Sequence, residues 1–81
     1  MSEKNREINA GQIYRHFKGN LYKVIGIATD SETEEKVVVY EAQYGTKELY
    51  VRPYSMFLEK LDTEKYPNEK QEYRFELVFK N

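Results

Sequence analysis

The sequence contains no cysteine among its 81 residues. A disulfide, a thiolate nucleophile and a sulfur-rich zinc site are therefore excluded, and a reducing cytoplasm is the location that we predict. The single histidine, His16, has no second imidazole with which to bind a transition metal. We accordingly predict neither a metal nor another cofactor.

Long apolar runs and a surplus of charge are also missing. The longest apolar stretches, at 24–27 and 37–40, are far shorter than the ~18–20 residues of a membrane span, and no signal-peptide pattern opens the chain. Thirteen basic side chains oppose fourteen acidic ones, so the basic face typical of a duplex nucleic-acid binder is not expected. We predict a soluble protein that does not bind membranes.

The pattern that is present is one of short strands. Alternating and β-branched residues predict strands at 13–17, 21–29, 36–42, 49–52 and 73–79, with one helical turn at 53–58 that Pro53 begins. Gly19 predicts a tight turn and Gly26 a bulge. In the first strand, Ile13 and Phe17 are expected to face the core, with Tyr14 and His16 on the other face.

These elements predict a mainly β fold. We expect a small SH3-like domain, either a strongly bent sheet or a partly open barrel, with one short helical turn. Residues 1–10 are polar and predict a flexible N-terminal arm, whereas residues 11–81 form a single small β domain.

Several segments together resemble a known family. They are GQIYRHFKGNLYKVIGIATDSETEEKVVVYEAQYG, YVRPYSMF and a late YRF, spanning residues 11–75. They resemble the small bacterial proteins grouped as domain of unknown function 1653. Asp30 stands where that family usually has histidine, and Tyr50 where it usually has tryptophan. The resemblance implies a single domain and brings no established activity.

Two smaller patterns leave alternatives open. His16 either hydrogen-bonds structurally or takes part in a small enzyme or ligand sensor with Glu32 or Glu35. The segment DSETEE, residues 30–35, predicts either a hairpin loop capped by its own side chains or a recognition loop. We expect at least one of its acids to meet Arg15, Arg52 or Lys36.

The strongest functional signal is aromatic. Eight tyrosines and four phenylalanines are many for a core of this size, so some tyrosines are expected at the surface beside arginine, as in interface anchors. We predict an uncharacterised binding module for a protein or peptide partner. This prediction favours a non-enzyme over an enzyme. Single-stranded nucleic acid and homo-oligomerisation remain alternatives. The predicted binding residues are Tyr14, Arg15, His16, Glu32, Tyr40, Tyr44, Tyr50 and Arg52.

Overall fold

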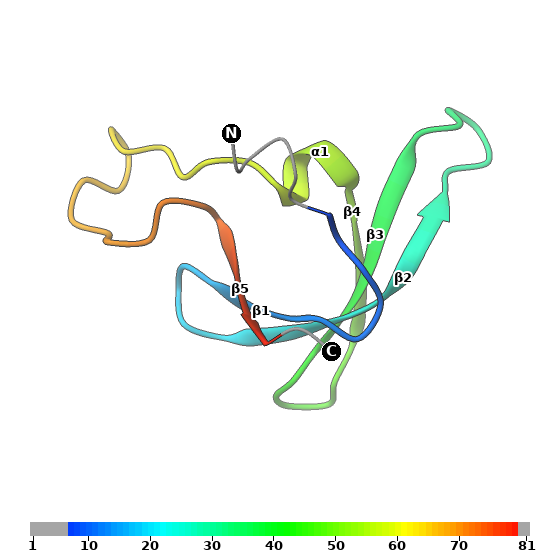
Figure 1. Ribbon diagram of the computed structural model, residues 1–81, viewed down its shortest axis with the longest axis horizontal. Coiled ribbons are helices and arrows are strands. Elements are labelled where there is room, and N and C mark those ends of the chain that lie inside the picture. The colour runs from blue at the N-terminus through cyan, green and yellow to red at the C-terminus, as the bar shows by residue number, and fades with distance from the viewer. Residues whose placement is uncertain (1–6, 80–81) are drawn as a thin grey trace.

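The computed structural model describes residues 7–79 and shows one antiparallel sheet with a single short helix (Figure 1). The strands are β1 (Ile13–His16), β2 (Leu21–Thr29), β3 (Lys36–Ala42), β4 (Leu49–Pro53) and β5 (Phe75–Phe79). Their order across the sheet is β4-β3-β2-β1-β5. The sheet bends strongly but does not close into a barrel, because β4 and β5 do not pair. The prediction of a mainly β fold built on a bent, open sheet is confirmed.

Glycine sets two features of this sheet. Gly19 has a φ of 109° and its N–H donates to the carbonyl of His16 at 2.7 Å, closing the β1–β2 turn. In β2 the pairing with β3 shifts between Val24 and Gly26, so that Ile25 is an extra, bulged residue. The predicted turn and bulge are both confirmed.

The inner face of the sheet carries the core. Residues directly opposite each other on antiparallel strands share a face, and the pairs Val24–Tyr40 and His16–Phe75 place these side chains on one face. Helix α1 (Tyr54–Phe57) covers this face with Phe57. The Phe57 ring is fully buried and stacks on Phe75 with the centroids 4.2 Å apart.

The predicted faces of the first strand are wrong. Tyr14 is buried at 3% exposure in the core, whereas Arg15 is exposed. Phe17 is indeed buried, but it lies in the turn after β1 has ended and packs against Tyr66 with centroids 4.6 Å apart. Because the alternation of a strand stops where the strand stops, counting back from Phe17 assigns the wrong face to Tyr14 and His16.

The last two elements differ slightly from expectation. Pro53 ends β4, pairing with Val37, and caps α1 rather than beginning it. Strand β5 begins at Phe75, because Tyr73 forms only an isolated bridge with Lys60. Among residues 7–79 there is no helix long and apolar enough to cross a membrane.

The end of the predicted N-terminal arm packs onto the body of the domain. Ile8 is 3% exposed and belongs to the core, and its N–H donates to the Tyr54 hydroxyl at 3.1 Å. Gln12 is buried as well, with its Oε1 accepting from the Tyr14 hydroxyl at 3.0 Å. Residues 1–6 of the predicted arm lie outside the described part of the chain.

Candidate functional site

The inner face holds an open pocket of about 240 Å³ beside the part that α1 covers. All five strands contribute to its lining, so the site exists only once the whole sheet is paired. The lining residues are His16, Tyr22, Tyr40, Tyr50, Arg52 and Phe75. We call this site the tyrosine pocket.

Cross-strand pairing brings the aromatic rings of the tyrosine pocket together. Tyr40 lies directly opposite Tyr50 on β4, and their ring centroids are 5.7 Å apart. Tyr22 meets the Tyr40 ring edge to face at 5.4 Å, and His16 meets the Phe75 ring at 5.0 Å. Such edge-to-face contacts hold the rings in fixed orientations.

Arg52 supplies the cation of the pocket. Its guanidinium lies 5.7 Å from the centroid of the Phe75 ring, and its Nε donates a long hydrogen bond of 3.4 Å to the Tyr40 hydroxyl. Within residues 7–79, no carboxylate lies within ion-pair distance of Arg52. Its two terminal nitrogens therefore have no hydrogen-bond or ion-pair partner among the described residues.

His16 is a neutral hydrogen-bond donor at this site. Its Nδ1 accepts the N–H of Lys18 at 3.1 Å, which places the ring hydrogen on Nε2. Burial, and then the positive charges of Arg74, Arg52 and Lys18, lower the pKa of His16 from 6.5 to about 4. The imidazole is consequently uncharged at neutral pH.

The hydroxyls of Tyr22 and Tyr50 also remain protonated. The Tyr22 and Tyr44 hydroxyls form a hydrogen bond of 2.9 Å. Partial burial and then this bond raise the pKa of Tyr22 to about 12. Partial desolvation, followed by the negative charge of Glu48, raises the pKa of Tyr50. Both hydroxyls therefore keep their hydrogen at neutral pH.

The tyrosine pocket brings together five of the eight predicted binding residues. His16, Tyr40, Tyr50 and Arg52 line it, and Tyr44 reaches its edge through Tyr22. Tyr14 instead lies in the core, and Arg15 is exposed on the outer face of β1. Glu32 lies in the β2–β3 loop, which projects away from β1 and β5 (Figure 1).

Two lining residues were absent from the predicted set. Tyr22 follows the β1–β2 turn and pairs with Tyr14, so a correct face for β1 would have included it. Phe75 reaches the pocket because β5 pairs with β1, although 59 positions separate Phe75 from His16 in the chain. The alternation of the last strand marks Phe75 as inward-facing but does not say which strand lies beside it.

The acidic loop is organised by its own side chains. Asp30 Oδ1 accepts the N–H groups of Glu32 and Thr33, and Thr33 Oγ1 accepts that of Glu35. The capped-loop interpretation is thus confirmed. The expected ion pair is not formed, since Lys36 Nζ donates to Thr29 Oγ1 and no acid of the loop pairs with a described cation. His16 likewise has no hydrogen bond to Glu32 or Glu35.

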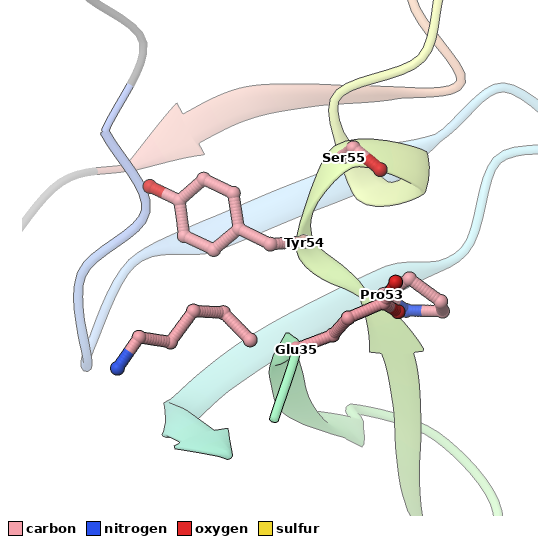
Figure 2. Close-up of a pocket in the computed structure, with 5 residues that line it drawn as sticks. Glu35, Pro53, Tyr54 and Ser55 are labelled. Carbon is pink, nitrogen blue, oxygen red and sulfur yellow. The ribbon is translucent and has the colours of Figure 1, made fainter. Parts of the chain in front are cut away.

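A larger concavity of about 390 Å³ lies at the other end of β3 and β4. Figure 2 shows Tyr54 pointing from α1 toward the N-terminal segment, with Glu35 and Pro53 on the opposite wall. Because the Tyr54 hydroxyl already accepts the Ile8 N–H, its main polar group is engaged within the fold. In the described chain, no group of three potential metal ligands occurs at either concavity.

Comparison with known sequences assigns the family. The chain matches the family described as "Protein of unknown function (DUF1653)" over residues 12–77. The protein belongs to the DUF1653 family. The match covers every residue of the tyrosine pocket.

A solved structure agrees with this DUF1653 assignment. The chain is 32% identical to a DUF1653 protein from Bordetella bronchiseptica whose crystal structure superposes with a TM-score of 0.72. The similarity covers 89% of this chain and 88% of that one. A comparison with curated proteins gives no match.

Proposed function

We propose that this DUF1653 domain is a binding module that recognises a protein or peptide segment through the tyrosine pocket. The observation that carries the proposal is the convergence of aromatic side chains and one arginine from all five strands on one open pocket. Tyrosine and arginine are the residues that most often anchor protein interfaces. Tyr44 and Tyr50, at 43% and 40% exposure, offer ring surface to a partner.

The size of the pocket supports a single side chain or a chain terminus as its occupant. Pockets that enclose drug-sized ligands measure roughly 300–1,000 Å³, and the tyrosine pocket, at about 240 Å³, is smaller and open. A peptide would insert one residue and lie along the exposed part of the inner face. The proposal includes a cytoplasmic location, which the absence of cysteine supports, and an SH3-like use of a bent sheet for peptide binding.

The test is a selection from a random twelve-residue peptide display library. Wild type is expected to enrich peptides whose addition shifts the NMR resonances of His16, Tyr22 and Phe75. The Arg52→Ala variant should bind these peptides at least ten-fold more weakly, because it removes the charged anchor. The matched control, Arg15→Ala, removes an exposed arginine on the outer face and should bind within two-fold of wild type.

Either of two outcomes would overturn the proposal. One is that no peptide is enriched over Arg52→Ala, and the other is that enriched peptides shift residues outside the tyrosine pocket. An oligothymidylate titration in low salt tests the nucleic-acid alternative. Binding of that strand at the pocket, without peptide binding, would replace the proposed partner class.

A further inference from the structure

We infer that the tyrosine pocket holds a carboxylate, supplied by an acidic side chain or by the C-terminus of a peptide. This inference rests on the proposed function, since it names the group that the binding module recognises. Its basis is an arginine that has no acidic partner among residues 7–79, at a pocket whose other polar side chains are an imidazole and tyrosine hydroxyls.

The charge around the pocket favours an anion. Among the described residues, the lining contains Arg52 and neither aspartate nor glutamate. Arg74 and Lys18 lie close enough to His16 to act on its titration, whereas Glu48 acts on Tyr50 at the opposite end. Arg74 is paired with Glu59 at 3.6 Å, whereas Arg52, the cation that lines the pocket, is not neutralised within the described chain.

The donors match a carboxylate in number and shape. The terminal nitrogens of Arg52 form a planar fork, and a carboxylate accepts both of its arms in one plane. His16 Nε2–H and the hydroxyl of Tyr40, which accepts from Arg52 Nε and keeps its own hydrogen, can donate to the remaining lone pairs. The side chains of His16 and Tyr22 at the site are partly buried, and partial burial strengthens charge-assisted hydrogen bonds.

Other occupants suit the pocket less well. Four aromatic rings resemble a cage for a methylated cation, but Arg52 would repel such a ligand and no lining carboxylate would attract it. Phosphate carries up to two negative charges, whereas one cation lines the pocket among residues 7–79. A singly charged, planar carboxylate matches both the charge and the fork of Arg52.

The test uses short capped peptides that need no prior selection. The first pair is acetyl-Gly-Glu-Gly-amide against acetyl-Gly-Gln-Gly-amide, and the second is acetyl-Gly-Gly with a free C-terminus against its amide. We expect the carboxylate member of at least one pair to shift the His16 and Arg52 side-chain resonances, with an affinity at least five-fold tighter than its neutral partner. The pair that responds identifies the source of the carboxylate.

Variants assign the effect to the pocket. Arg52→Gln should weaken binding of the carboxylate peptide at least five-fold, and Arg15→Gln should leave it within two-fold. Tyr40→Phe deletes the hydroxyl to which Arg52 Nε donates, without removing ring packing, and we expect a two- to five-fold loss from it. This second variant keeps the inference testable if Arg52→Gln does not fold.

Failure of the inference is distinguishable from failure of the proposed function. Two results would overturn the inference that the pocket holds a carboxylate. One is equal binding of both members in both pairs, and the other is tighter binding of inorganic phosphate than of either carboxylate. If display peptides still bind the pocket in that case, the binding module stands without it. If the capped carboxylates bind while the display selection enriches nothing, the carboxylate site stands and the peptide partner fails.

Discussion

His16 lies at the end of β1 and holds a turn and a pocket wall together. Its Nδ1 accepts the Lys18 N–H of the β1–β2 turn, while its ring packs edge-on against Phe75. Protonation would oblige Nδ1 to become a donor and would add a charge beside Arg52 and Arg74. The same side chain therefore links the stability of the turn to its own charge state.

This linkage predicts how stability depends on pH. The pKa of His16 falls from 6.5 to about 4 on folding, so the unfolded chain takes up this proton at a higher pH than the folded protein does. The stabilisation is fully present above pH 6.5 and is lost as pH falls toward 4. With allowance for solvent screening, the loss amounts to about 1–2 kcal/mol.

Urea denaturation at pH 7 and pH 4.5 measures this loss. The control variant His16→Asn keeps an acceptor for the Lys18 N–H but does not titrate. Carboxylates titrate in both proteins, so the difference between them isolates His16. On acidification, the free energy of unfolding of the wild type should fall by about 1–2 kcal/mol more than that of the variant. Equal decreases would show that His16 is not buried in its neutral form.

Among the elements, the β1–β2 hairpin and strand β2 each contain a glycine, but only the hairpin glycine has a positive φ. Gly19 adopts a φ of 109°, which side chains rarely adopt, although a Cβ there would meet nothing within 4 Å. Gly26 follows the bulged Ile25, and a Cβ there would also meet nothing within 4 Å. Space is thus equal at the two sites, and only the backbone conformation differs.

Replacing each glycine by alanine tests whether only the Gly19 position requires glycine. Gly19→Ala should lower the free energy of unfolding by about 1–2 kcal/mol, because a Cβ is strained at positive φ. Gly26→Ala should stay within about 0.5 kcal/mol of wild type, since neither strain nor a clash opposes it. Chemical denaturation compares them, and an equal loss in both would show that the bulge also requires glycine.

The elements differ in how far sequence predicts them. Strands β2 and β3 have the bounds that alternation and β-branched residues predict, since both are long and are bounded by turn residues. The faces of β1 were predicted wrongly, because a strand of four residues gives too short an alternation to reveal where it ends. Loop capping by Asp30 was predictable because those hydrogen bonds are local.

In the whole molecule, Phe75 belongs both to the core and to the tyrosine pocket. Phe75 stacks on the fully buried Phe57 and also lines the pocket. The pairing of β5 with β1, which brings Phe75 to His16, is a long-range contact that local patterns do not encode. The tyrosines and Arg52 could therefore be proposed as a surface from the sequence, but their meeting with Phe75 could not.

A core of this size gives the protein a small free energy of unfolding. Small single cores supply about 3–5 kcal/mol, and Phe→Ala substitutions at buried sites cost about 3–5 kcal/mol. We therefore expect Phe57→Ala to abolish cooperative folding. The milder Phe57→Leu should cost about 1–2 kcal/mol and should also broaden the Phe75 resonances at the pocket.

Met56 supplies the matched control for this substitution. It is the neighbour of Phe57 on α1 but is 43% exposed, so Met56→Leu should change stability by less than about 0.5 kcal/mol. Thermal unfolding followed by circular dichroism compares the two variants. Equal transitions would show that α1 does not contribute to the core through Phe57.

The position of Phe75 in both the core and the pocket has a consequence for biosynthesis. Every other residue of the tyrosine pocket is translated before Phe75, the nearest being Arg52, 23 positions earlier. A nascent chain that ends before β5 lacks both the stacking partner of Phe57 and one wall of the pocket. We therefore expect the proposed recognition of a partner to begin only after this strand has left the ribosome.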